Sequence, residues 1–320
     1  MKNTARAHTN IALIKYWGKS DPILRLPLMS SLSMTLDAFY TDTLIEKTDA
    51  KNEFYLNGKR QNGQAQKRVF SYLDTLKEKF GYTDNLIVKS TNHVPTSAGL
   101  ASSSSAFAAL TASFCKLYNL DVDKAELSRL ARLGSGSASR SIFGGFAIWQ
   151  KGNSNQSSYA YALDEKPKMD LQLLAVELNT EQKKISSTKG MKDAQSSPFF
   201  STWTNRNQLE LDEMIKAIKQ NDFTALGSLA ELNANEMHAI NLTAQPEFTY
   251  FMPETIRAIK LVEDLRTKGI ECYYTIDAGP NIKVLCQLKN RKEIIEHFES
   301  VFNNVNIVSA SFGPGVIYLD

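Results

Sequence analysis

Pro95-Thr-Ser-Ala-Gly-Leu-Ala-Ser-Ser-Ser-Ser-Ala106 is the most informative stretch of this sequence. It leads directly into apolar residues at helical spacing, from Phe107 to Tyr118. Small residues let a backbone approach a ligand closely, and the first turn of a helix directs unpaired amide groups at the same place. With its serine hydroxyls added, the stretch predicts a cradle for phosphate oxygens.

Two common alternatives fit this stretch less well. It is not a Walker A loop, because no Gly-Lys-Ser/Thr triplet follows. A flexible serine linker would be flanked by polar, low-complexity sequence, whereas Val94 precedes this stretch and an apolar helix follows it. The phosphate cradle is therefore the favoured interpretation.

A second segment rich in glycine and serine is Ala131-Arg-Leu-Gly-Ser-Gly-Ser-Ala-Ser-Arg-Ser-Ile-Phe-Gly-Gly145. Its serine hydroxyls and the guanidinium of Arg140 could grip a diphosphate or a carboxylate, for which arginine offers a planar, two-point fork. A structural loop that carries a solvated arginine explains the same residues equally well.

A third segment, Thr9-Asn-Ile-Ala-Leu-Ile-Lys-Tyr-Trp-Gly-Lys19, places two lysines around an aromatic pair and a glycine. Lys15 follows an apolar strand, so its ammonium could be partly buried and would then need an anionic partner. The alternative is a surface loop with two solvated lysines.

A fourth segment joins two apolar strands through Asp277-Ala-Gly-Pro280. A carboxylate at such a join is a catalytic candidate, since functional groups often lie where a rigid strand meets a loop. An aspartate before a Gly-Pro turn is also ordinary turn chemistry. The four histidines are scattered and give no metal-ligand spacing.

Composition limits the class of protein. The chain has 320 residues, of which 42% are hydrophobic and 22% charged, as in a globular protein with a real core. A net charge of +3 gives no reason to expect nucleic acid or a membrane surface as a partner. No segment has the length of a signal-peptide core or a membrane span. We therefore expect a soluble, cytoplasmic protein whose three cysteines are reduced.

Helices and strands are expected to mix without strict alternation, which favours the α+β class. We expect two domains, residues 1–185 and 186–320. The periodicity predicts helices at 64–80, 107–118, 122–133 (with Asp121 as its N-cap), 207–220, 222–240, 253–268 and 291–302. It predicts strands at 9–17, 32–47, 53–56, 86–89, 144–149, 171–178, 270–276, 282–288, 305–311 and 315–319.

Taken together, the four segments resemble the GHMP superfamily of small-molecule kinases. That superfamily has an N-terminal substrate motif, a Pro-x-x-x-Gly-Leu-x-Ser-Ser phosphate loop and a late glycine-containing motif. Within it, the segments 10–19, 135–140 and 275–281 are similar to those of the diphosphomevalonate decarboxylases, and the match spans roughly residues 5 to 319. The resemblance implies an N-terminal domain like ribosomal protein S5 domain 2, a C-terminal ferredoxin-like domain, and a site between them.

The resemblance also implies a reaction and its partners. ATP, accompanied by Mg²⁺, would phosphorylate the tertiary hydroxyl of (R)-5-diphosphomevalonate, and loss of phosphate and CO2 would give isopentenyl diphosphate in the mevalonate pathway of isoprenoid biosynthesis. No metal site made by the protein alone is implied. A homodimer is what the family suggests.

The resemblance assigns roles to individual residues. The catalytic residues would be Asp277, Arg140 and Lys15, with Arg140 binding the substrate carboxylate and helping to hold Asp277. The substrate would contact Tyr16, Trp17, Gly18, Lys19, Arg68, Ser135, Gly136, Ser137, Ala138, Ser139, Arg140, Ser187 and Thr188, with Lys67 competing for the place of Arg68. The ATP phosphates would contact Pro95, Ser97, Gly99, Leu100, Ala101, Ser102 and Ser103.

Three other functions remain alternatives. They are a decarboxylase specific for the monophosphate, a kinase that stops at the phosphorylated hydroxyl, and a sensor that has kept the ATP-binding fold without catalysis. The sensor is disfavoured because Lys15, Arg140 and Asp277 are all present.

Overall fold

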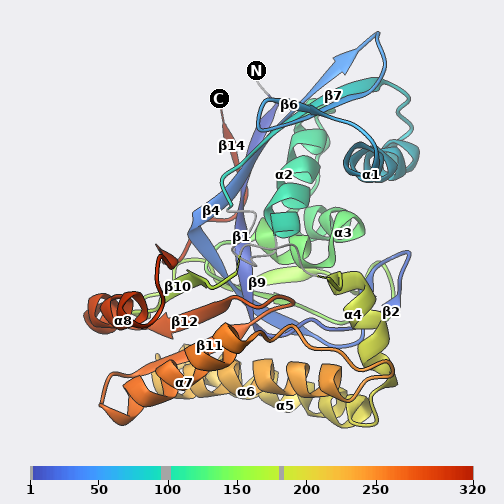
Figure 1. Cartoon of the computed structure of the whole chain (residues 1–320). Coiled ribbons are helices and arrows are strands. Elements are labelled where there is room, and N and C mark those ends of the chain that lie inside the picture. The colour runs from blue at the N-terminus through green and yellow to red at the C-terminus, as the bar shows by residue number, and fades with distance from the viewer. Residues whose placement is uncertain (1–2, 95–101, 180–183, 320) are drawn as a thin grey trace.

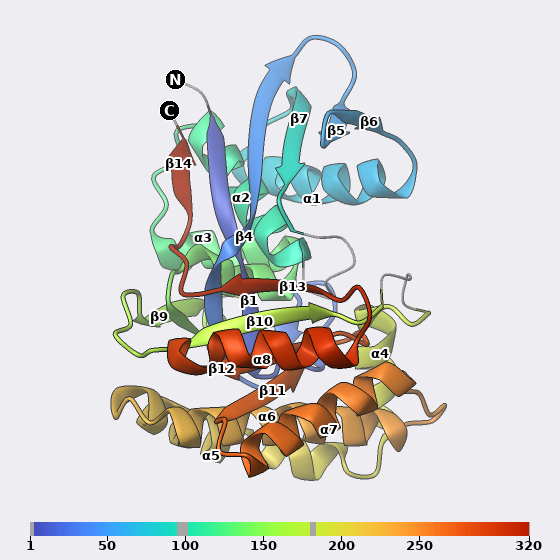
Figure 2. The same ribbon diagram turned by 60° about the vertical axis from the view of Figure 1, so that its left-hand side comes forward.

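The structure is a computed structural model that describes residues 3–94, 102–179 and 184–319 (Figure 1). Most of its strands belong to two sheets, and helices cover both of them (Figures 1 and 2). This mixture confirms the α+β class.

The first sheet has eight strands and holds most of the first half of the chain. The strand order is β14-β1-β4-β7-β5-β6, and β8 and β9 extend it beside β4. The strands are β1 (Thr4–Ile14), β4 (Ser31–Thr48), β5 (Glu53–Leu56), β6 (Lys59–Gln61), β7 (Asn85–Asn92), β8 (Phe146–Trp149), β9 (Ala160–Asp164) and β14 (Ile317–Leu319). A small separate ribbon pairs β2 (Lys19–Asp21) with β3 (Leu26–Pro27).

Three helices and a 3₁₀ segment lie against this sheet: α1 (Gln64–Phe80), α2 (Ser102–Leu117), α3 (Lys124–Gly134) and η1 (Gly136–Ile142). Helix α2 is buried along most of its length, because small residues such as Ala108 and Ala112 let it pack closely on β1 and β4. The N-cap of α3 is Asp123, whose side chain accepts a hydrogen bond from the amide of Glu126. The sequence-based choice of Asp121 was wrong by two residues, since both aspartates precede the same helical pattern.

The second sheet has the order β11-β12-β10-β13, with all neighbours antiparallel. Its strands are β10 (Gln172–Glu177), β11 (Cys272–Ile276), β12 (Ile282–Cys286) and β13 (Asn306–Ala310). The helices of this half are α4 (Ser187–Asp193), the 3₁₀ turn η2 (Ala194–Ser196), α5 (Phe200–Lys219), α6 (Phe223–Leu242), α7 (Pro253–Thr267) and α8 (Leu288–Val301). The domain division expected at residue 185 stays a prediction, although β10 pairs with strands from beyond it.

Alternation along the strands of the second sheet gives it two different faces. Leu174 and Val176 pack with α7 and α8, whereas Leu173 and Ala175 pack with α5 and α6. The second of these cores continues into β1, through Ile11 and Leu13, and therefore belongs to both sheets. This shared core fixes the C-terminal end of β1 against α6.

Most sequence-predicted elements are confirmed, with shifted ends. The helix at 64–80 begins and ends as expected, and Gly81 ends it in the left-handed conformation with φ 77°. Helix α5 begins at Phe200 rather than 207, and α8 at Leu288 rather than 291. Strand β9 and helix α4 were not predicted, because each is short and carries no clear apolar periodicity.

Gly227 offers a test of the contact between α6 and β11. A Cβ atom added at Gly227 would lie 2.0 Å from Cδ2 of Tyr273, so the ring or the helix must move. Alanine normally favours a helix over glycine by about 1 kcal/mol, but overpacking costs about 1–3 kcal/mol. We expect Gly227→Ala to lower the free energy of unfolding, measured by urea denaturation. The exposed Leu232→Ala on the same helix should change it by less than about 0.5 kcal/mol, and a stabilised Gly227→Ala would contradict the prediction.

Candidate active site

An ion pair between Lys15 and Asp277 is the centre of the site. Lys15 is the first residue after β1, and Asp277 is the first after β11. The Lys15 Nζ lies 2.7 Å from Oδ1 of Asp277 and also donates a hydrogen bond to the carbonyl oxygen of Ala12, at 2.9 Å. The lysine side chain is 2% exposed and the aspartate side chain 22%, so the carboxylate is the partner that a ligand can reach.

The electrostatic surroundings keep Asp277 ionised. Burial alone would raise the pKa of its carboxyl group, but the positive charges of Lys15, Lys283 and Arg140 and the hydrogen bond from Lys15 lower it below its ordinary value. The carboxylate is therefore ionised at neutral pH and can accept a hydrogen bond.

Arg140 lies beside this pair, in η1, and is 2% exposed. Its Nε and one terminal nitrogen donate to Oδ1 of Asn10, at 3.4 and 3.2 Å, and the other terminal nitrogen donates to the hydroxyl of Ser31. Burial lowers the pKa of the guanidinium to about 10, against the charge of Asp277, so it stays positive at neutral pH. Arg140 makes no ion pair with a carboxylate of the described residues, which leaves its charge for an anionic ligand.

The segment after Lys15 is held by aromatic packing. The Tyr16 ring lies 4.6 Å from that of Trp149, and the tyrosine hydroxyl has no hydrogen-bond partner within the described chain. The Trp17 indole donates to Oδ1 of Asn241 at 2.8 Å. Gly18 has φ 142°, and a Cβ there would meet Leu28 at 3.0 Å, so this position requires glycine.

Three positive side chains gather next to this segment: Lys19, Arg25 and Arg68. Burial lowers the pKa of Lys19, and the charges of Arg25 and Arg68 lower it further. Arg25 donates from Nε to the carbonyl oxygen of Leu133, 2.7 Å away. Arg68 stacks over the Phe107 ring at 4.8 Å. The cluster suits a multiply charged anion, and the choice of Arg68 over Lys67 as a substrate ligand stays a prediction.

Serine side chains join the start of α2 to the loop before η1. The Ser103 hydroxyl lies 3.2 Å from that of Ser135, which lies 3.3 Å from that of Ser137. A Cβ added at Gly136 would lie 2.8 Å from the Tyr16 ring, so this position also requires glycine. Ser139 is fully buried and donates to the carbonyl oxygen of Gly136, 2.7 Å away, while Ala138 lies in the core. The predicted phosphate-binding and substrate-binding segments therefore meet.

Most of the predicted phosphate cradle lies outside the residues that the structure describes. Pro95, Ser97, Gly99, Leu100 and Ala101 lie outside the described residues. Ser102 and Ser103, which begin α2, are the members of that stretch whose positions are described.

Ser187 and Thr188 open helix α4, whose N-cap is Ser186. Gly190 brings this helix against Trp17, because a Cβ at Gly190 would lie 3.0 Å from Cζ2 of the indole. The helix therefore lies next to the segment that contains Tyr16 to Lys19.

Sequence reasoning missed several residues around the predicted ones. Asn10, Ser31 and Asn233 form hydrogen bonds with them, and the charges of Arg25 and Lys283 act on Lys19 and Asp277. Lys283 had a usable signal, since it is the one charged residue of the otherwise apolar strand β12. Ser31 and Asn233 had none, because their partners are distant in the sequence.

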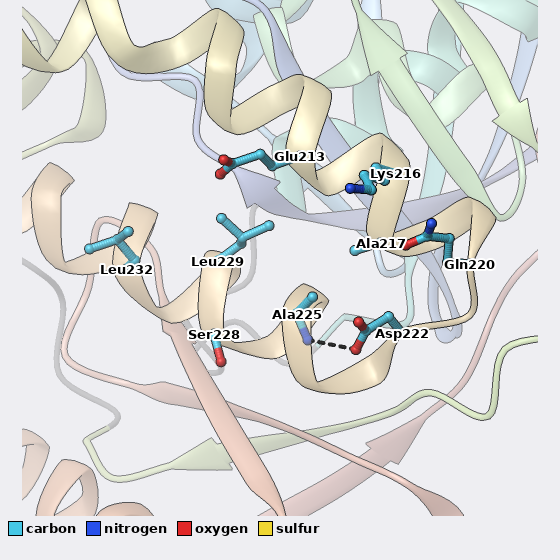
Figure 3. Close-up of a pocket in the computed structure, with 9 residues that line it drawn as sticks. All are labelled: Glu213, Lys216, Ala217, Gln220, Asp222, Ala225, Ser228, Leu229 and Leu232. Carbon is cyan, nitrogen blue, oxygen red and sulfur yellow. Dashed lines mark hydrogen bonds between the residues drawn. The ribbon is translucent and has the colours of Figure 1, made fainter.

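The described residues contain no group of three or more His, Cys, Asp or Glu side chains that could hold a metal ion. They also contain no helix long and apolar enough to cross a membrane. A shallow pocket of about 370 Å³ between α5 and α6 shares no lining residue with the site (Figure 3).

Comparison with known proteins places the chain in a family. Residues 7–160 match the diphosphomevalonate decarboxylase-like N-terminal domain, and residues 173–314 match the mevalonate 5-diphosphate decarboxylase C-terminal domain. The diphosphomevalonate decarboxylase of Debaryomyces hansenii is 33% identical over 95% of this chain and 84% of its own length. That of Aspergillus fumigatus is 35% identical over 91% of this chain and 78% of its own.

Solved structures agree. The mevalonate diphosphate decarboxylase of Staphylococcus aureus superposes with a TM-score of 0.96 and 40% identity, covering 100% of this chain and 98% of that one. A structure named MDDEF in complex with MVAPP, AMPPCP and magnesium has a TM-score of 0.92 and 43% identity, covering 98% and 97%. The fold is therefore that of the GHMP kinases, and the chain belongs to the diphosphomevalonate decarboxylase family of carboxy-lyases.

Proposed function

We propose roles for the residues of this site in the ATP-dependent decarboxylation of (R)-5-diphosphomevalonate. The reaction consumes ATP and gives isopentenyl diphosphate, ADP, phosphate and CO2. The observation that carries the proposal is the Lys15–Asp277 pair, with Arg140 beside it and a hydroxyl contact between Ser103 and Ser135 that joins the two predicted ligand segments. The complex with MVAPP, AMPPCP and magnesium supports the same ligands here.

The chemistry needs three kinds of group. Hydroxide is a poor leaving group, so the tertiary hydroxyl of the substrate must first become a phosphate ester. Loss of that phosphate leaves positive character on a tertiary carbon, which the electrons of the departing carboxylate quench. The site must therefore orient a hydroxyl, stabilise phosphoryl charge and hold a carboxylate in its ionised form.

Asp277 orients the hydroxyl and accepts its proton, because it is ionised and the more exposed partner of the ion pair. Lys15 lies against the same carboxylate and stabilises negative charge on the transferring phosphoryl group. Arg140 binds the substrate carboxylate, since its charge is not paired with an acidic residue of the described chain.

The diphosphate binds to the cluster of Lys19, Arg25 and Arg68, with the serine hydroxyls of residues 135–139 and those of Ser187 and Thr188. Tyr16, Trp17 and Gly18 form the wall that shapes this subsite. Ser102 and Ser103, at the start of α2, contact the ATP phosphates. Mg²⁺ carried by the nucleotide would neutralise part of the phosphate charge. We also propose that the enzyme is cytoplasmic, as its cysteine usage suggests, and a homodimer, as the family resemblance suggests.

A product assay tests the reaction. With ATP and Mg²⁺, the mono- and diphosphate forms of the substrate should be compared side by side for release of ADP, phosphate and CO2. We expect equal amounts of all three from the diphosphate and little turnover of the monophosphate. ADP without CO2 would instead identify a kinase, and preferred turnover of the monophosphate would identify the other decarboxylase.

Asp277→Asn tests the role of the carboxylate. The amide keeps the shape but cannot accept a proton, so we expect kcat to fall by about 10²–10⁴ while the Kd for ATP, measured by calorimetry, changes little. Asp49→Asn, in the exposed turn after β4, is the matched control and should leave kcat unchanged. Near-normal turnover by Asp277→Asn would remove this residue from the mechanism.

Lys15→Met tests the electrostatic coupling. Lys15 lowers the pKa of Asp277, so its removal should raise that pKa, even though Lys283 and Arg140 still lower it. Because the ionised carboxylate is the active form, activity is lost as the pH falls through this pKa. The acid limb of the kcat/KM profile of Lys15→Met should therefore lie at higher pH than that of the unaltered enzyme. An unmoved limb would show that Asp277 does not set it.

A further inference from the structure

Helix α6 contacts the backbone of both strand ends that carry the Lys15–Asp277 pair, at Lys15 and at Ile276. Asn233 of α6 accepts a hydrogen bond from the backbone amide of Lys15 through Oδ1, at 2.7 Å. His238 of the same helix lies with Nε2 3.3 Å from the carbonyl oxygen of Ile276, the residue before Asp277. One helix thus touches the end of β1 and the end of β11 (Figure 1).

The contact with Lys15 is buried and has no substitute from the sheet. Strand β1 ends at Ile14, so the Lys15 amide lies beyond the last residue of that strand. Asn233 is 1% exposed and Lys15 is 1% exposed, so water does not compete freely for this hydrogen bond. A buried amide left without a partner costs about 1–3 kcal/mol.

Glu210 of α5 fixes the orientation of the Asn233 side chain. The amide nitrogen of Asn233 donates to Oε2 of Glu210 at 2.6 Å. A flipped amide would turn its NH2 group toward the N–H of Lys15 and its oxygen toward the carboxylate. Both contacts would be repulsive, so Glu210 selects the orientation in which Oδ1 faces Lys15.

Glu210 is itself held in place. It is 2% exposed, and its Oε1 accepts a hydrogen bond from Nε of Arg206 at 3.2 Å. Arg206 also lies 3.3 Å from a carboxylate oxygen of Glu236. The path from Arg206 through Glu210 and Asn233 to Lys15 therefore consists of direct contacts between α5, α6 and the end of β1.

We infer that Asn233, oriented by Glu210, is a positioning residue for Lys15. It fixes the backbone from which the Lys15 ammonium reaches Asp277, through side-chain contacts with the Lys15 amide and with Glu210. The inference rests on the proposed role of Lys15 in the reaction. A displacement of about 1 Å at a reacting group can lower the rate by about 10², so losing this hydrogen bond should lower kcat and leave ligand affinity largely intact.

Asn233→Asp and Glu210→Gln together test this path. In Asn233→Asp, Oδ1 can still accept from Lys15, but the other carboxylate oxygen faces Glu210 at hydrogen-bond distance and repels it. At pH 8 we expect kcat to fall by about 10², with the KM values for ATP and (R)-5-diphosphomevalonate within about threefold. Adding Glu210→Gln supplies an amide donor to the new carboxylate and should return kcat to within about tenfold of the unaltered enzyme.

A matched substitution on the same helix is the control. Asn235 is exposed, and its Oδ1 accepts a hydrogen bond from the Tyr274 hydroxyl at 3.0 Å, which an aspartate can also do. Asn235→Asp should leave kcat unchanged. If Asn233→Asp does not fold, the double variant still tests the path, because it should keep kcat within about tenfold of the unaltered enzyme at constant KM, and a larger loss contradicts the inference.

Two results would overturn the inference. One is a kcat for Asn233→Asp within about twofold of the unaltered enzyme. The other is a double variant that recovers the Tm, measured by circular dichroism, without recovering kcat, because restoring the contact between residues 210 and 233 would then not restore the function of Lys15. Neither result affects the proposed function as long as the unaltered enzyme releases CO2. Release of ADP without CO2 by the unaltered enzyme would contradict the proposed function itself.

Discussion

The site depends on one contact, the ion pair between a lysine at the end of the first long strand and an aspartate 262 residues later. Burying an ammonium is unfavourable unless a negative partner and further hydrogen bonds compensate for its lost hydration. Lys15 has both, from Asp277 and from the carbonyl oxygen of Ala12. The two halves of the fold therefore meet where each supplies the charge that the other needs.

The neighbouring groups follow from the same constraint. Arg140 and Lys283 add positive charge around Asp277, so the carboxylate is stabilised in its ionised form even though it is partly enclosed. His238, also close by, is 2% exposed, and burial together with the charge of Lys15 lowers its pKa to about 3. It stays neutral at physiological pH and adds no further charge. An excess of fixed cations around one carboxylate suits a reaction whose substrate and co-substrate are both anions.

Local features of the fold could be predicted from the sequence because their causes are local. Apolar spacing and a terminal glycine give α1, and the Asn57-Gly58 turn gives the hairpin of β5 and β6. Helix α4 was missed because it is short and polar, and its position is set by packing on Trp17. The N-cap of α3 is Asp123 rather than Asp121 because the helix begins at Lys124, and apolar periodicity does not fix the first residue of a helix that closely.

The candidate site was predicted in part, for a related reason. Lys15, Arg140 and Asp277 stood out as charged residues inside apolar or glycine-rich segments, and the family resemblance gave them roles. The residues that hold them did not stand out. Asn10 lies 130 residues from Arg140, and Asn233 lies 218 from Lys15, so no spacing along the chain could join them. Such contacts become visible only when the sheets have assembled.

The apolar core that runs from β1 into α5, α6 and β12 couples the unfolding of the two sheets. Ile11, Leu13, Leu173 and Met214 lie in one cluster, so neither half can lose its packing without exposing the other. Unfolding should then proceed as a single cooperative transition. In a fragment that ends before β10, the apolar side chains of β1 would be exposed to water, and the fragment would tend to aggregate.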